Sequence, residues 1–263
     1  MGALEVITVV GSSERHRDSP LLLVHGICHG AWCWQPNYAP YLAGLGYDVH
    51  AVSLRGHGGS AGHSVLHRYR LQDYVDDVVE TAASLPSPPI VIGHSMGGAI
   101  AQVVAIDHPT AVRAAVLLAP LGPGALRLRE LARTVRRFRR VPPLMKLLAR
   151  GKVTPSQANR LPFFDNRLDD AGAHLAAEQL HDESWRALLQ ILTTFNTRAG
   201  AAPIPMLLVG SRQDAIFEAP SLRRNAAHYE IDPVILDTGC HDLMLDPKWR
   251  ESADVIASWM EQL

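Results

Sequence analysis

The stretch VIGHSMGGAI at residues 91–100 decides the fold. It joins a short apolar run rich in β-branched residues to a segment of helical character, and Gly93 and Gly97 flank Ser95 in the spacing G-x-S-x-G. Glycines on both sides permit a tight strand-to-helix turn that exposes the serine hydroxyl. The same turn directs the free N–H groups of the helix N-terminus at negative charge developing beside Ser95. The pattern predicts a nucleophilic serine, and a serine that only caps a helix is the alternative.

Similar apolar runs recur along the chain and alternate with longer amphipathic segments. Continuous apolar runs are typical of parallel strands buried on both faces, and the alternation is typical of strands linked by crossover helices. The sequence therefore predicts an α/β protein with a mostly parallel, twisted sheet flanked by helices. The expected strands cover 4–10, 21–26, 47–54, 89–95, 113–120, 205–211 and 233–239, and the expected helices cover 34–44, 69–85, 96–108, 218–228 and 247–262.

The interval between the fifth and sixth expected strands breaks this alternation, because it holds some 85 residues without a convincing strand. A connecting loop of that length is uncommon in a compact domain. The spacing of its apolar residues is helical instead. Its expected helices cover 126–140, 144–151, 155–162 and 169–195. We therefore predict an α/β core formed by 1–120 and 203–263, with a helical cap inserted at 121–202.

Composition bounds the class of protein. The 263 residues are 47% hydrophobic, carry a formal charge of −1 and include three cysteines without CxxC spacing. A near-neutral charge argues against nucleic-acid binding, and the odd number of scattered cysteines indicates neither a disulfide framework nor a zinc site. No run reaches the roughly 18 apolar residues of a membrane helix, and the N-terminal segment lacks a secretory signal. We expect a cytoplasmic protein without metal, cofactor or transmembrane segment.

A nucleophilic serine needs a base, and the base needs an acid that orients it. In the predicted fold both follow the serine in chain order, on loops after later strands. Asp214 lies just past the sixth expected strand and His241 just past the seventh, so we predict a catalytic triad of Ser95, Asp214 and His241. Two other acids compete with Asp214. Asp237 lies within its strand, and Asp242 is expected to point away along the loop.

The tetrahedral intermediate of acyl transfer needs two preorganised N–H donors for its oxyanion. The turn after Ser95 makes the backbone N–H of Met96 one candidate. The loop after the second expected strand supplies the other, for which Ile27 is the candidate. Several side chains are candidates for the wall of an apolar substrate pocket, with core packing as the alternative for each. They are Cys28, His29, Trp32, Phe163, Phe164 and Trp185.

These motifs together resemble those of an α/β-hydrolase over essentially the whole chain. The resemblance rests on HG at 25–26, RGHGGS at 55–60, GHSMGG at 93–98, Asp214 and the GCHDLMLDP run around His241. Within the superfamily, HGICHGAWCW at 25–34 is similar to the corresponding loop of plant methylesterases and hydroxynitrile lyases.

Two differences from related enzymes exclude some activities of the superfamily. The lyases place a lysine after the catalytic histidine, where this chain has Asp242, so cyanohydrin cleavage is disfavoured. Epoxide hydrolases and haloalkane dehalogenases have an aspartate nucleophile at the position of Ser95, so they are disfavoured too.

The resemblance implies a serine hydrolase of the carboxylesterase or thioesterase type. Its substrate would be a small to medium, mostly apolar acyl ester that passes through an acyl-Ser95 intermediate. A carbon–carbon bond hydrolase and an acyl-transferring or cyclising enzyme of a biosynthetic pathway use the same triad and are alternatives. A ligand receptor of this fold without turnover is a further alternative, because fold does not determine function.

The predicted cap begins with a basic segment. Residues 127–152 hold ten Lys or Arg against one acid, Glu130, so the rest of the chain sums to about −10. The solvated face of an amphipathic helix explains such a run. The alternative is a surface that docks an anionic partner, such as an acyl carrier protein, a coenzyme A thioester or an acidic lipid surface. The expected ligand is a small-molecule ester or thioester, and this segment is the expected place for any anionic partner.

Overall fold

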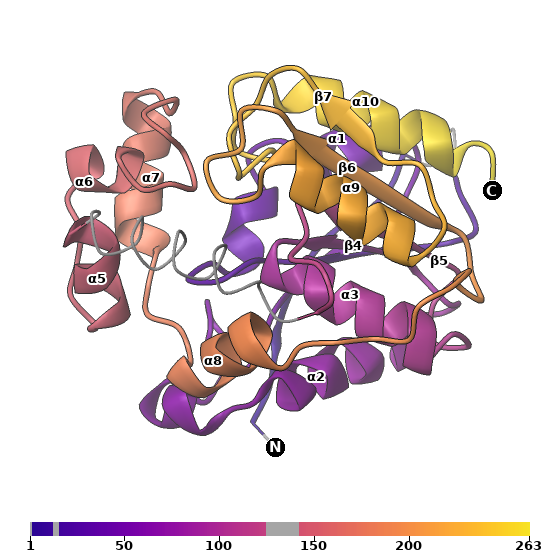
Figure 1. The fold of residues 1–263 in the computed structure, drawn as a ribbon, viewed down its shortest axis with the longest axis horizontal. Coiled ribbons are helices and arrows are strands. Elements are labelled where there is room, and N and C mark those ends of the chain that lie inside the picture. Colours follow the sequence, from indigo (N-terminus) through magenta and orange to yellow (C-terminus); the bar gives the residue numbers. More distant parts are fainter. Residues whose placement is uncertain (1, 13–15, 125–141) are drawn as a thin grey trace.

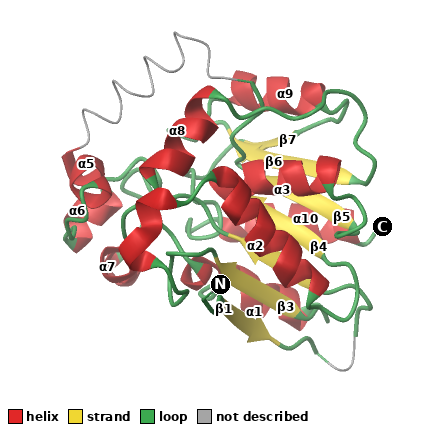
Figure 2. Cartoon of the chain, turned by 90° about the horizontal axis from the view of Figure 1, so that it is seen from below, coloured by secondary structure: helices red, strands yellow, loops and turns green. Residues whose placement is uncertain are grey.

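A computed structural model describes residues 2–12, 16–124 and 142–263. Within these residues, one seven-stranded sheet has the order β1-β3-β2-β4-β5-β6-β7 and carries helices on both faces (Figures 1 and 2). β1 pairs with β3 antiparallel, and every other neighbouring pair is parallel. The predicted α/β-hydrolase fold is therefore confirmed. The strands are β1 (Glu5–Val9), β2 (Leu21–Val24), β3 (Val49–Ser53), β4 (Ile90–His94), β5 (Ala114–Leu118), β6 (Met206–Ser211) and β7 (Val234–Leu236).

Five helices flank this sheet where the sequence predicts them. They are α1 (Tyr38–Gly44), α2 (Leu71–Ala83), α3 (Met96–Asp107), α9 (Ala219–His228) and α10 (Trp249–Met260). The expected helix at 34–44 differs at its start, because a separate 3-10 turn covers Ala31–Trp34 and the α-helix begins only after Pro36. Proline has no N–H to continue a helical ladder. None of the described helices has the length and apolar character needed to cross a bilayer.

The strands β2, β4, β5 and β6 are buried on both faces of the sheet, which is why they read as continuous apolar runs. Successive side chains of a strand point to opposite faces. Leu21 and Leu23 of β2 pack in the cluster that includes α1 and α10, whereas Leu22 and Val24 pack in the cluster that includes α2, α3 and α9. All four are fully buried. Both cores also include residues of β4, so the strand that leads to Ser95 is held from both sides.

We call residues 121–202 the insertion, and its division from the core stays a prediction. Its described helices are α5 (Pro142–Leu148), α6 (Pro155–Asn159), α7 (Asp170–Gln179) and α8 (Trp185–Thr193). The first three stand together at one end of the sheet, and α8 packs along α2 (Figure 1). The expected helix at 169–195 is wrong, because the chain leaves the helix after α7 and Ser184 caps a new one by accepting from the N–H of Ala187 at 3.3 Å.

The basic segment at 127–152 lies mostly outside the described residues, as does the expected helix at 126–140. In its described part, Arg150 pairs with Asp182 of the insertion at 2.8 Å. Docking of an anionic partner at this segment therefore stays a prediction.

The turn between β4 and α3 has no room for a side chain at position 93. A Cβ at Gly93 would overlap the carbonyl oxygen of Gly97 and lie 2.8 Å from the backbone nitrogen of Gly98. These are backbone atoms of α3, so they cannot rotate away. We expect Gly93→Ala to lower the free energy of unfolding by about 3 kcal/mol, measured by urea denaturation.

Gly44→Ala is the matched control for this prediction. Gly44 ends α1, and a Cβ there would meet nothing within 4 Å. Because alanine is the better helix former, we expect the free energy of unfolding to stay the same or to rise by up to about 1 kcal/mol. Equal losses in both variants would contradict the packing argument.

Candidate active site

Ser95 occupies the turn between β4 and α3. Its backbone has φ 53° and ψ −109°, which residues with a side chain rarely adopt. Strain of this kind costs about 1–3 kcal/mol and persists only where the surrounding structure enforces it. The N–H of Ser95 donates to the carbonyl of Leu118 on β5 at 3.0 Å, which helps to hold the turn. Met96 is the first residue of α3, so its N–H has no acceptor within the helix and is available to a ligand.

The loop after β2 passes directly beside Ser95. A Cβ at Gly26 would lie 3.0 Å from the Cβ of Ser95, so the loop approaches this closely because it has no side chain there. The imidazole of His25 holds the start of this loop against the end of β3. Its Nδ1 donates to the carbonyl of Gly26 at 2.8 Å, and its Nε2 accepts from the N–H of Leu54 at 3.0 Å. Burial lowers the pKa of His25 well below its ordinary value, which suits a neutral ring with one donor and one acceptor. Ile27 follows in this fixed loop.

His241 and Asp214 meet from two different loops. The Nδ1 of His241 lies 2.8 Å from Oδ2 of Asp214, and both side chains are buried. The other carboxylate oxygen accepts from the backbone N–H groups of Ile216 at 2.7 Å and Phe217 at 2.9 Å, which fixes its orientation. Nδ1 must donate to the carboxylate, so a neutral His241 has its lone pair on Nε2. This Nε2 is buried and has no hydrogen-bond partner among the described residues, Ser95 included.

The two competing acids have other surroundings. The side chain of Asp237 is 86% exposed and bonds to Arg212 at 2.7 Å. Asp242 does not point away along the loop, and that expectation is wrong. It is fully buried, with Oδ2 at 2.8 Å from Nε2 of His29 and Oδ1 at 3.5 Å from Nε2 of His94. A buried carboxylate needs partners, and here the partners are histidines from distant segments.

His94 directly precedes Ser95 and contacts the loop that carries His241. Its Nε2 donates to the carbonyl of His241 at 3.1 Å, and burial lowers the pKa of His94 to about 3, so its ring is neutral. In the described part of the chain, His94, His241 and Asp242 form the one set spaced for a metal ion, with ligand atoms within 4.8 Å of one another. Because this set includes His241, a metal bound there would compete with proton transfer.

Aromatic rings surround His241. The ring centroid of Phe163 lies 6.5 Å from that of His241 and 5.4 Å from that of His29. The ring of Phe164 lies 6.2 Å from His29. The ring centroid of Phe217 lies 5.2 Å from that of His241. Phe217 was not among the expected pocket residues. Its position three residues after Asp214 is the feature of the sequence that could have identified it. The insertion thus contributes apolar surface next to the histidine.

The other three expected pocket residues differ in their burial. Cys28 is fully buried, and Trp32 stacks on His29 with ring centroids 5.2 Å apart. Trp185 is 45% exposed on α8, and no ring contact joins it to the other aromatic residues in the described ranges.

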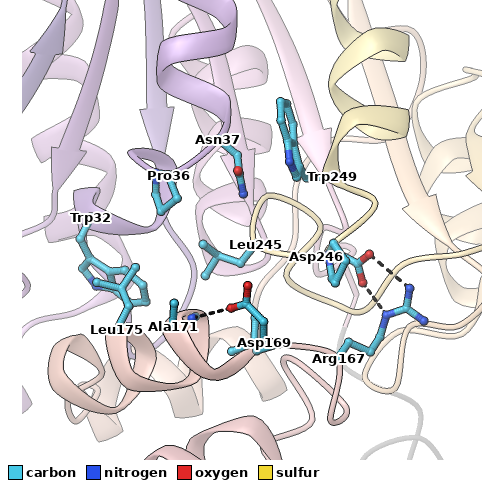
Figure 3. A pocket seen from close by; sticks show the side chains of 13 residues that line it. Trp32, Pro36, Asn37, Arg167, Asp169, Ala171, Leu175, Leu245, Asp246 and Trp249 are labelled. Atoms are coloured by element: carbon cyan, nitrogen blue, oxygen red, sulfur yellow. Dashed lines mark hydrogen bonds and ion pairs between the residues drawn. The ribbon is translucent and has the colours of Figure 1, made fainter.

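Trp32 also forms part of a cavity of about 570 Å³ (Figure 3). Arg167 and Asp246 pair at 2.6 Å at the wall of this cavity. Ser95, Asp214 and His241 are not in its lining. The lining comprises Trp32, Pro36, Asn37, Arg167, Leu168, Asp169, Ala171, Gly172, Leu175, Leu245, Asp246, Pro247 and Trp249. This cavity is therefore distinct from the candidate active site.

Comparisons with curated proteins match part of the chain. Methylesterase 7 from Arabidopsis thaliana is 37% identical over 113 residues, which are 42% of this chain and 43% of that protein. Epoxide hydrolase B from Mycobacterium tuberculosis is 35% identical over 105 residues, which are 39% of this chain and 29% of that protein. The aligned stretch thus spans less than half the length of these relatives.

Solved structures and a family model match nearly the whole chain. A carboxylesterase from Nitrososphaera gargenis has a TM-score of 0.75 at 20% identity and covers 99% of this chain and 94% of its own. The thioesterase domain from the curacin biosynthetic pathway has a TM-score of 0.71 at 20% identity, over 97% and 95%. Identities this low show the fold alone. The model of the serine aminopeptidase S33 family matches residues 15–248. The chain therefore belongs to the serine aminopeptidase S33 family of α/β-hydrolases.

Proposed function

We propose that this protein is a serine hydrolase that cleaves small to medium, mostly apolar carboxylic esters or thioesters. The observation that carries the proposal is the buried His241–Asp214 pair, 2.8 Å apart, in a protein whose Ser95 is held on a strained strand-to-helix turn. The methylesterase relatives support an ester as the substrate. The three cysteines are free and buried, and we place the protein in the cytoplasm, where thiols stay reduced.

The proposed reaction has two acyl transfers. His241 Nε2 takes the proton of Ser95 Oγ as Oγ bonds to the ester carbonyl carbon, and the N–H groups of Ile27 and Met96 stabilise the oxyanion. The intermediate collapses, and the alcohol leaves with the proton from His241. A water then gives a proton to His241 and attacks the acyl carbon. When this second intermediate collapses, His241 returns the proton to Ser95 Oγ, which releases the acid and restores Ser95. Asp214 orients His241 and stabilises its protonated form throughout.

The substrate class is tested with p-nitrophenyl esters of graded acyl length, methyl esters of aromatic acids and aminoacyl p-nitroanilides. We expect ester turnover with an optimum at short to medium acyl chains, and anilide turnover at least about 100-fold lower because amide nitrogen is the poorer leaving group. Turnover of anilides alone would overturn the proposal in favour of peptidase chemistry. Binding of ligands that raises the melting temperature without any product would overturn it in favour of a receptor.

The pH dependence follows from the surroundings of His241. Burial alone would lower its pKa, but the charge and hydrogen bond of Asp214 outweigh burial, Asp242 adds to them, and the pKa is raised above its ordinary value of 6.5. The base acts only when it is unprotonated, so we expect kcat/KM to fall as the pH drops through an apparent pKa above 6.5. The effect of pH on folding stability has the opposite sign. Because the folded pKa of His241 is raised, its protonated form stabilises the fold; this contribution is complete below the unfolded pKa and is lost as the pH rises through the folded pKa.

Asp242→Asn tests whether Asp242 contributes to the raised pKa of His241. The change removes one buried negative charge near His241, so the acid limb of the kcat/KM profile should move to lower pH by about 0.5–1 unit. Asp237→Asn is the control, because its exposed charge is screened by solvent and we expect the limb to stay in place. Rates by pH-stat over about pH 5–9 measure both variants. A limb that moves equally in both, or in neither, would contradict a contribution of Asp242.

A further inference from the structure

Glu183 belongs to the insertion, between α7 and α8, yet its side chain is enclosed by the core. It is fully buried. Its Oε2 accepts from Nε2 of His57 at 3.0 Å and from the N–H of Cys28 at 3.3 Å. Its Oε1 accepts from the N–H of Ser184 at 2.7 Å and from the hydroxyl of Tyr74 at 3.1 Å. One carboxylate thus joins the loop after β2, the turn after β3 and helix α2 to the insertion.

His57 and Glu183 form a buried ion pair. The Nδ1 of His57 lies 3.1 Å from the carbonyl oxygen of Arg55, which can only accept, so both ring nitrogens of His57 carry protons. Burial would lower the pKa of His57, but the charge of Glu183 outweighs burial and raises it. Burial would likewise raise the pKa of Glu183, but His57 outweighs burial and lowers it. Loss of either charge leaves the other buried without compensation, so the pair fixes the carboxylate in place.

The insertion also holds both polar backbone groups of Cys28. The N–H of Cys28 donates to Glu183, and its carbonyl accepts from the N–H of His181 at 3.2 Å. Cys28 has φ 66°, a left-handed conformation that costs free energy for a residue with a side chain. The residue before it is Ile27, whose N–H is the proposed oxyanion donor. The insertion therefore fixes the peptide unit that directly follows Ile27.

We propose that Glu183 is a positioning residue for the oxyanion loop, which we define as residues 25–29. Its ion pair with His57 fixes the carboxylate, and its hydrogen bond to Cys28 keeps the N–H of Ile27 directed at the reacting carbonyl. Donors stabilise an oxyanion only when they are preorganised, so a loosened loop weakens the transition state more than the bound substrate. This inference rests on the proposed function. It gives the insertion a part in the chemistry itself.

Glu183→Gln is the test variant, because it is nearly isosteric. An NH₂ group replaces one carboxylate oxygen, so it faces the N–H of either Cys28 or Ser184. We expect kcat to fall about tenfold or more with KM within about twofold, since the interaction acts in the transition state. The affinity of a trifluoromethyl ketone, which forms a tetrahedral adduct with the serine, should fall by the same factor as kcat/KM. Tyr74→Phe is the matched control: it removes a donor from Oε1 and leaves the Cys28 contact, so kcat should stay within about twofold.

Two further readouts separate positioning from stability alone. Rates are normalised to Ser95 titrated with a fluorophosphonate, so unfolded enzyme does not count. A kcat defect in Glu183→Gln that vanishes on this normalisation would overturn the inference, as would unchanged kcat and inhibitor affinity. Amide hydrogen exchange at Cys28 is measured in parallel, and we expect it to be at least about tenfold faster in Glu183→Gln than in the wild type.

The exchange measurement also separates this inference from the proposed function. If the wild type cleaves no ester, the proposed function fails, and exchange alone decides whether Glu183 holds the loop. Faster exchange at Cys28 in Glu183→Gln would then support that role, and unchanged exchange would overturn it.

Discussion

Ser95→Ala should lower the rate of p-nitrophenyl ester hydrolysis by about 10⁴-fold or more. The variant lacks the atom that carries the acyl group in the proposed reaction, in which Oγ bonds to the substrate carbon. Alanine keeps the Cβ and the backbone N–H that donates to Leu118, so the turn and the N–H of Met96 stay in place. We therefore expect the free energy of unfolding to change by less than about 1 kcal/mol. Mass spectrometry of quenched reactions should detect an acyl adduct on the wild type and none on the variant.

Ser87→Ala is the control for the loss of a serine hydroxyl. Ser87 is partly exposed, and its Oγ donates to the carbonyl of Asp18 at 3.0 Å. We expect its rate to stay within about twofold of the wild type. A Ser95→Ala enzyme that keeps more than about one hundredth of the rate would show that the reaction bypasses Ser95.

Asp214→Asn should lower kcat by about 10³- to 10⁴-fold while the protein stays folded. The reason lies in how the carboxylate is held. One of its oxygens accepts from the N–H groups of Ile216 and Phe217, so the carbonyl oxygen of an asparagine takes that place. The NH₂ group then faces Nδ1 of His241, which must accept in place of donating. The proton of the neutral imidazole moves to Nε2, and the base is lost.

Asp237→Asn is the matched control for this prediction. Asp237 is the other acid near the end of the sheet, and its exposed carboxylate bonds to Arg212. Because exposed ion pairs contribute little, we expect kcat within about twofold of the wild type and similar stability. A loss at Asp237 as large as that at Asp214 would overturn the assignment of the orienting acid.

Buried histidines concentrate around the serine turn. His25, His29, His57, His94 and His241 are all at most 1% exposed. They include neutral rings such as His94, the ion pair of His57 with Glu183, the contact of His29 with Asp242, and His241 beside Asp214. Buried histidines need defined donors and acceptors, so this arrangement restricts how the loops around Ser95 can move.

Local patterns in the sequence predicted the sheet, most helices and the place of the serine. Each expected strand contains an observed one. The inner strands β2, β4, β5 and β6 can be recognised from their own residues, because an apolar run of this kind is typical of a strand buried on both faces. The glycines around Ser95 likewise act within a few residues, since Gly93 contacts Gly97 and Gly98. Chain order placed Asp214 and His241 on loops after successive strands, where the structure brings them to 2.8 Å.

Only the tertiary structure decided the buried ionic contacts and the break between α7 and α8. Glu183 is separated from His57 by 126 positions and from Cys28 by 155, so no local period connects them. Glu183 falls within the helix expected at 169–195, and Asp242 was expected to point away along its loop. A charged side chain becomes buried only where a partner from another segment compensates its desolvation. That partner exists only after the insertion has folded onto the core.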